Sequence, residues 1–245
     1  MKPSGFFVEL KRRDVYRIAI GSALVSWLAA QGAATAAATQ APVPIEKEPR
    51  HRLKFENDSV RVFDVLIPPG DKSLFHTHVH DGLSVRITDA QIRDEGVRGD
   101  SKESTVKRGA VTFSYRPKPM THRVSNIGKT PFRNVFIEIL PSTGVSTSAP
   151  SPAARAGYTM VLENGRVRVC RFVLAPGQST YARPPALRGV RVAVSEGKIL
   201  IKAKGEEDKT VKLHQGDSQW HEEGMRYSLK NVGSMAFEAV DIELK

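Results

Sequence analysis

From His51 onward, hydrophobic and polar residues alternate in short runs that Gly, Pro, Asn and Asp interrupt. Four such runs stand out in the first half of this region, at 60–67, 83–87, 111–113 and 134–140. Alternation with a period of two places the apolar side chains on one face of a strand, and the interrupting residues favour turns. No helical period of comparable length occurs in the same region. The pattern therefore predicts an all-β sandwich or barrel.

The pattern also repeats. At an offset of 107 residues, Glu56-Asn57, Val60-Arg61-Val62, Pro69-Gly70 and Gly109 recur as Glu163-Asn164, Val167-Arg168-Val169, Pro176-Gly177 and Gly216. Asn126-Ile127-Gly128 recurs as Asn231-Val232-Gly233, after which 136–140 aligns with 240–244. Landmarks that recur in one order indicate a duplicated β unit. We expect units at 51–140 and 157–245, joined by a Ser/Pro-rich linker at 141–156.

The N-terminal segment, 1–41, has a different composition. Five positive charges lie within 1–17, an uncharged apolar run comes next at 18–30, and small residues come after it. This order is typical of a signal peptide, and positive charge before the apolar run favours export of the downstream chain. Arg12-Arg13 loosely matches a twin-arginine export signal, whereas a retained membrane anchor and a cytosolic amphipathic tail are the alternatives. We expect a periplasmic protein, or one held on the outer face of the inner membrane, with a spacer at 42–50.

Composition limits the chemistry. The 245 residues carry a formal net charge of +11, which favours anionic partners, but no nucleic-acid recognition motif accompanies it. The single cysteine, Cys170, excludes an internal disulfide framework and a cysteine-based zinc cluster. Any metal site must therefore use carboxylates and the seven histidines.

Three histidines have a spacing that suits a metal. His76 and His78 are two residues apart on a predicted strand, so they project to the same face, and His122 from a neighbouring strand can complete a triad. Imidazole ligands suit iron, manganese, zinc, copper or nickel.

These residues resemble the two motifs of the cupin superfamily. Gly70, five residues, then His76-Thr77-His78 is similar to the first motif, and Gly109 with His122 and Asn126 is similar to the second. The resemblance implies two jelly-roll barrels, as in the germin and oxalate decarboxylase group, with a divalent metal (iron, manganese or zinc) held by His76, His78 and His122. The motif glutamate is missing, because Gly82 and Leu83 occupy its two expected positions. Some cupins, the thiol dioxygenases among them, function with three histidines alone.

Further residues extend this hypothesis. If its strand stays regular, His80 lies on the face of His76 and His78, where it is a candidate general base, fourth ligand or substrate contact. Asp81 is a candidate partner for one imidazole. In the second unit, Arg183, Pro185 and Tyr227 replace the three histidines, so we expect that unit to have lost the ligands. One alternative gives Arg183, Arg188 and Arg191 a role in binding an anion.

Two functions fit this sequence. The first is a metal-dependent enzyme, an oxygenase, isomerase or lyase acting on a small anionic substrate, with His80 as its catalytic residue. The second is a non-catalytic periplasmic module that binds a small ligand or a metal. The fold does not choose between them, because one fold hosts many chemistries. A homo-oligomer formed through the barrels, and membrane contact through an uncleaved N-terminal segment, stay open.

Overall fold

A computed structural model describes residues 41–141, 157–180, 187–203, 205–224 and 227–245. Within these ranges the chain forms β-strands joined by turns, with one short 3-10 segment, η1 (Ile45–Lys47). The predicted all-β class is therefore confirmed. The predicted signal or anchor helix and most of the Ser/Pro-rich linker lie outside the described residues. In the described part of the chain, no helix has the length and apolar character needed to cross a membrane.

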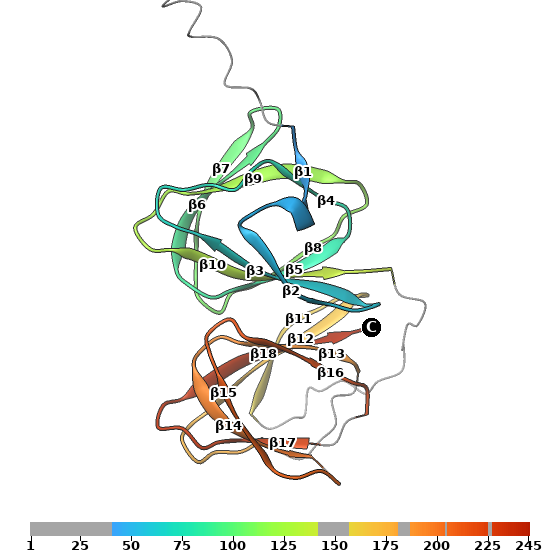
Figure 1. Cartoon of the computed structure of the whole chain (residues 1–245), viewed down its shortest axis with the longest axis vertical. Helices are drawn as coiled ribbons and strands as arrows, with labels where there is room; N and C mark the ends of the chain where they lie inside the picture. The colour runs from blue at the N-terminus through green and yellow to red at the C-terminus, as the bar shows by residue number, and fades with distance from the viewer. Residues whose placement is uncertain (1–40, 142–156, 181–186, 204, 225–226) are drawn as a thin grey trace, which may run out of the picture. The chain divides into compact units, whose positions relative to one another are not determined.

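The first half of the described chain forms two five-stranded sheets, with the strand orders β2-β3-β10-β5-β8 and β1-β4-β9-β6-β7. In Figure 1 these sheets face each other and enclose a barrel interior. The strands are β1 (Val43–Pro44), β2 (His51–Glu56), β3 (Val60–Ile67), β4 (His76–His78), β5 (Asp81–Arg86), β6 (Ala90–Gly96), β7 (Ser101–Val106), β8 (Val111–Ser114), β9 (Met120–Asn126) and β10 (Phe132–Ile139).

The second half repeats this arrangement with a five-stranded sheet, β11-β12-β18-β13-β16, and a three-stranded sheet, β15-β14-β17. The strands are β11 (Tyr158–Glu163), β12 (Val167–Leu174), β13 (Gly189–Ala193), β14 (Gly197–Ala203), β15 (Lys209–Leu213), β16 (Ser218–His221), β17 (Tyr227–Asn231) and β18 (Phe237–Leu244). Strands β2-β3-β10-β5-β8 correspond in order to β11-β12-β18-β13-β16, as expected for a duplicated unit.

The register of the last strand corrects the sequence alignment by one residue. Phe132 of β10 pairs with Ile67, and Phe237 of β18 pairs with Leu174, so β10 corresponds to β18 at an offset of 105. The match of 136–140 with 240–244 is therefore wrong by one position. Both strands are buried on both faces over most of their length, so their nearly continuous apolar sequence does not mark which face is which.

Three hydrophobic clusters stabilise these sheets. One fills the interior of the first barrel around Phe63, and another fills the second around Phe172. The third is shared, because it joins residues of both halves, among them Val85 and Ile137 with Val190 and Ile242. Burial of apolar area contributes roughly 25 cal/mol per Å², so this shared cluster stabilises both halves together.

Candidate metal centre

The three predicted ligands come from two neighbouring strands. His76 and His122 are directly opposite each other in the antiparallel pairing of β4 with β9, and His78 lies two residues further along β4. The ring centroid of His76 lies 4.9 Å from that of His78 and 4.7 Å from that of His122. The structure therefore brings His76, His78 and His122 together.

A fourth imidazole, absent from the sequence prediction, joins them. His51 begins β2, and its ring centroid lies 4.4 Å from that of His76. One ligand nitrogen from each of His51, His76 and His78 lies within 4.8 Å of the others. No motif spacing links His51 to the later histidines, and β2 is not adjacent to β4 or β9 in either sheet. Only closure of the barrel brings it to the site.

Hydrogen bonds orient three of the four rings. Nδ1 of His51 bonds the Glu48 carboxylate at 2.6 Å, Nδ1 of His76 bonds the Leu74 carbonyl at 2.9 Å, and Nδ1 of His122 bonds Asp94 at 2.8 Å. A ligand histidine typically donates its second N–H in this way, which fixes its tautomer and its ring orientation. In each of these three rings, Nε2 is left to bind a metal.

The inward nitrogens fit a metal ion. Nε2 of His76 is buried and has no hydrogen-bond partner among the described residues. Nε2 of His78 lies 3.1 Å from Nε2 of His122. Two nitrogens bound at adjacent positions about 2.1 Å from one metal are separated by about 3.0–3.4 Å. The separation of the His78 and His122 nitrogens therefore matches that of two ligands on one ion.

Burial keeps two of the rings uncharged. It lowers the pKa of His76 to about 3, with further lowering by the neighbouring His51 and His122. The pKa of His78 is also lowered, first by burial and then by His122 and His76. Metal ions bind the neutral imidazole, so both rings are in their binding form at neutral pH.

Glu48 carries the negative charge nearest to His51. Its side chain is buried and accepts hydrogen bonds from the backbone N–H groups of Arg50 and Leu74 as well as from His51. Burial acts to raise the pKa of Glu48, but the hydrogen bonds from His51 and Leu74, together with electrostatic interactions with His51 and His76, outweigh it and leave the pKa lowered. The carboxylate therefore stays ionised beside the imidazole.

Packing explains why the motif glutamate is missing. A Cβ atom at Gly82 would lie 2.3 Å from Cζ of Phe136, so a side chain at this position would require the Phe136 ring to shift. Leu83 is fully buried in the shared cluster, on the face away from the site. Neither expected position supplies a ligand, and His51 enters the site from a different strand.

His80 and Asp81 lie elsewhere. Strand β4 ends at His78, so the regular strand assumed for His80 does not continue to it, and His80 does not line the cavity beside the histidines. Its pKa is lowered by burial and by the charge of Arg61. Its predicted catalytic role stays a prediction. Asp81 accepts a hydrogen bond from the Arg116 backbone and pairs with Arg166, so the proposed Asp81–imidazole contact is wrong.

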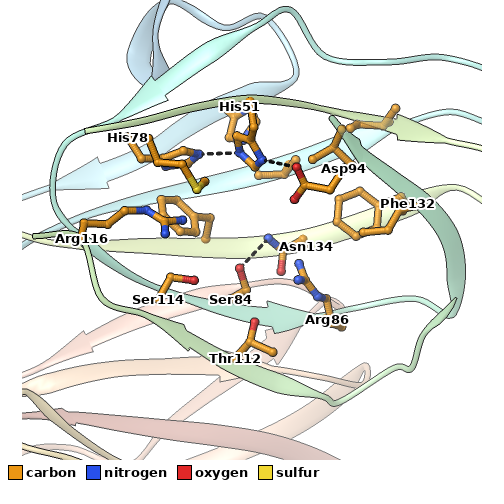
Figure 2. Close-up of a pocket in the computed structure, with 17 residues that line it drawn as sticks. His51, His78, Ser84, Arg86, Asp94, Thr112, Ser114, Arg116, Phe132 and Asn134 are labelled. Carbon is orange, nitrogen blue, oxygen red and sulfur yellow. Dashed lines mark hydrogen bonds and ion pairs between the residues drawn. The ribbon is translucent and has the colours of Figure 1, made fainter. Parts of the chain in front are cut away.

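This cavity, of about 250 Å³, lies against the histidines inside the first barrel. Figure 2 shows its labelled residues: His51 and His78 lie at one end, Ser84 and Asn134 lie in the middle, and the two arginines approach from different sides. Its lining is His51, Val65, Ile67, His78, Ser84, Arg86, Ile92, Asp94, Thr112, Ser114, Arg116, Met120, His122, Val124, Phe132, Asn134 and Phe136.

The second barrel fills the corresponding space with an ion pair. Arg191 and Asp241 are cross-strand neighbours where the first barrel has Ser84 and Phe136. The Arg191 guanidinium bonds both Asp241 oxygens, at 2.6 and 2.8 Å.

The same guanidinium donates to the Tyr227 hydroxyl at 2.6 Å. Tyr227 occupies the position of His122, and Tyr158 that of His51. Because Asp241 neutralises Arg191, this residue is a poor candidate for the alternative anion site. Arg183 and Pro185 lie outside the described residues.

Comparison with known proteins relates this fold to solved structures. No family model matches the sequence, and no curated protein sequence matches it. The structure of AerE from Microcystis aeruginosa is similar at a TM-score of 0.59 and 15% identity, over 83% of this chain and 98% of that one. Salicylate 1,2-dioxygenase from Pseudoaminobacter salicylatoxidans, in adducts with gentisate, is similar at a TM-score of 0.53 and 13% identity, over 76% of this chain and 68% of that one.

YhaK from Escherichia coli is similar at a TM-score of 0.50 and 18% identity, over 76% of this chain and 85% of that one. At such identities the similarities show the fold alone. They and the observed sheets show an all-β fold of the cupin jelly-roll type.

Proposed function

We propose that the first barrel binds one divalent metal ion through His76 and His78, together with His51 and His122. The observation that carries this proposal is the convergence of four imidazoles, three of which are oriented at Nδ1 by an acceptor. Nitrogen ligands of this type suit iron, manganese or zinc. Because imidazole ligands carry no charge, the bound ion would keep its full positive charge and favour an anionic ligand.

We further propose that the protein is a metal-dependent enzyme, an oxygenase, isomerase or lyase, acting on a small anionic substrate in the adjacent cavity. A bound metal would supply a Lewis acid with coordination positions that the histidines leave open. The apolar walls, including Phe132 and Phe136, exclude water, and the polar lining residues orient the substrate. The gentisate adducts of the similarly folded dioxygenase support a small anionic ligand.

Metal analysis tests the first part of this proposal. Protein prepared with iron, manganese or zinc should bind one ion per chain, and His51→Ala, His76→Ala, His78→Ala and His122→Ala should each lose most of it while staying folded. His214, which is exposed in the second half, provides the control variant His214→Ala. The proposal is wrong if none of the metals binds stoichiometrically, or if the four variants bind it as well as the parent.

Screening for turnover separates the enzyme from the non-catalytic alternative. Substrate-dependent oxygen uptake, or conversion of a small acid without oxygen, by the metal-loaded protein supports an enzyme. His80→Ala belongs in this screen, since a loss of turnover with metal retained would support its predicted catalytic role. A protein that binds metal and small acids but turns none over is the alternative, a ligand-binding module.

The N-terminal segment supports a second proposal, export or anchoring outside the cytoplasm. A reporter that is active only in the periplasm should become active when fused to residues 1–50. Lysine at both Arg12 and Arg13 should block this activity only if the twin-arginine pathway is used. An inactive parent fusion would contradict export.

A further inference from the structure

Two arginines in the cavity form no ion pair with a described carboxylate, although the charge of Asp94 acts on both. The side chains of Arg86 and Arg116 line it, and in the described part of the chain neither guanidinium forms a hydrogen bond or an ion pair. Arg86 lies over the ring of Phe132, 5.4 Å from its centroid. Burial lowers the pKa of Arg86 to about 10, which still leaves the group charged at neutral pH.

The other arginines of the same barrel form ion pairs or, like Arg52 and Arg98, are exposed, so these two stand apart. The pairs include Arg61–Glu138 at 2.7 Å, Arg93–Glu103 at 2.6 Å, Arg123–Glu95 at 3.0 Å and Arg133–Asp64 at 2.9 Å. Among the cavity-lining residues, Asp94 is the one carboxylate, and its Oδ1 already bonds His122. One lining carboxylate does not balance two partly buried guanidinium groups, so the fold holds positive charge ready for a ligand.

The two arginines differ in their position relative to the histidines. The charge of Arg116 contributes to the lowered pKa of His78, so Arg116 lies near the metal-binding end of the cavity. Figure 2 shows Arg86 on a different side, beside Asn134 and Ser84. A ligand that contacts the metal-binding end therefore still has an arginine at its other end.

Asn134 adds a second recognition group near Arg86. It is buried, and its Nδ2 donates to Ser84 at 3.3 Å. Its Oδ1 atom is buried without a partner among the described residues. This oxygen accepts a hydrogen bond, which a ligand hydroxyl can donate.

We propose that the cavity binds a small hydroxy acid, with its carboxylate on the Arg86 guanidinium and its hydroxyl on Asn134. This inference rests on the proposed function and names the substrate class of that same site. The planar guanidinium matches a carboxylate through two parallel hydrogen bonds. The cavity volume of about 250 Å³ has room for roughly eight water molecules at about 30 Å³ each, which suits an acid with a similar number of non-hydrogen atoms.

Calorimetric titration with two matched pairs of acids tests the proposal. Malate and succinate differ by one hydroxyl, as do salicylate and benzoate, and inorganic phosphate tests for a general anion site. Zinc-loaded and metal-free protein are titrated in parallel. We expect at least one hydroxy acid to bind more tightly than its partner and more tightly than phosphate. The proposal is overturned if neither hydroxy acid binds at millimolar concentration, or if phosphate binds in preference to both.

Variants assign the two contacts. Arg86→Gln should weaken hydroxy-acid binding by roughly 100-fold, and Arg86→Lys by less, with metal stoichiometry unchanged. Asn134→Ala should remove the preference for the hydroxy acid, roughly 3- to 10-fold, without weakening succinate or benzoate. Arg93→Gln, at an exposed paired arginine on β6, is the matched control. Unchanged binding in Arg86→Gln would overturn the proposal.

The two proposals fail separately. Hydroxy-acid binding that depends on Arg86 in metal-free protein, in a chain that takes up no metal, would contradict the metal site and support the anion site. Stoichiometric metal binding with no Arg86-dependent binding of any acid would support the metal site and contradict the anion site.

Discussion

At the scale of single residues, the imidazoles depend on the groups behind them. Glu48 and Asp94 have the same task, one on His51 and the other on His122, but Glu48 is buried whereas Asp94 is partly exposed. A carboxylate on Nδ1 makes the ring a better ligand and holds its orientation. Glu48 should contribute more to metal affinity than Asp94, because water cannot take the place of a buried carboxylate.

Glu48→Gln tests this difference. We expect metal affinity to fall by about 10- to 100-fold, since the amide keeps the shape but loses the charge that acts on His51. Competition with a metal chelator measures the change. Asp94→Asn is the matched variant and should cost less, because solvent reaches that carboxylate. Equal metal affinity in parent and Glu48→Gln would remove His51 from the ligand set.

The lowered histidine pKa values predict a pH dependence of stability in metal-free protein. His76 and His78 stay neutral in the folded chain, whereas in the unfolded chain they protonate with a pKa near 6.5. The unfolded state therefore binds more protons below pH 6.5. Their full contribution to the free energy of unfolding is present above that pH and is lost on acidification, at up to about 1.4 kcal/mol per pH unit for each ring.

Urea unfolding between about pH 6.5 and 5, above the range of most carboxylates, measures this slope. His76→Gln should reduce the slope of the free energy of unfolding against pH by the contribution of one ring. This holds whatever the substitution does to stability at pH 8. His214→Ala, at an exposed position, should leave the slope unchanged. A slope that is the same in His76→Gln and the parent would show that the pKa of His76 is not lowered in the folded chain.

At the scale of elements, each barrel has a closely packed glycine at the same position of one strand. Gly82 on β5 and Gly189 on β13 occupy corresponding positions. A Cβ at Gly82 would lie 2.3 Å from the Phe136 ring, and one at Gly189 would lie 1.9 Å from the carbonyl oxygen of Ile242. A ring can move by a small amount, whereas a backbone carbonyl inside a sheet is fixed.

Gly82→Ala should therefore lower the free energy of unfolding by about 1–3 kcal/mol, the usual cost of overpacking. Gly189→Ala should lower it more. Gly165→Ala, where nothing lies within 4 Å of the new Cβ, should stay close to the parent. Chemical denaturation measures all three, and a Gly82→Ala protein as stable as the parent would contradict the close packing of Phe136 on this glycine.

Local signals explain which parts of this architecture could be predicted. The alternation over 60–67 matches β3, and the spacing of His76, His78 and His122 placed three rings correctly, because each depends on strand geometry over a few residues. His51 could not be found in this way, since its approach to His76 depends on barrel closure. The packing of the Phe136 ring on Gly82 is likewise a contact between residues distant in sequence.

At the scale of the whole described chain, the site depends on residues that never touch it. The shared cluster joins strands of both halves, and ion pairs and hydrogen bonds also cross between them, including Arg108 with Glu238 and Arg133 with the Gln215 carbonyl. Strands β5 and β10 carry Arg86, Asn134 and Phe136 into the cavity, and their other faces contribute Val85 and Ile137 to the shared cluster. The half without metal ligands therefore supports the sheet from which the cavity is built.

This support predicts that a cavity made in the second half weakens the first. Ile242 is fully buried in the shared cluster on β18, so Ile242→Ala should lower the free energy of unfolding by about 2–5 kcal/mol. Because one cluster stabilises both halves, circular dichroism and release of bound metal to a chelator should shift together and keep coincident midpoints. Val173→Ala, at a position 49% exposed in the same half, should shift neither signal. In Ile242→Ala, the contrary result would be metal release that keeps the parent midpoint while the dichroism splits into two transitions. That result would mean that the halves unfold independently. It would also mean that the second half contributes no stability to the metal site.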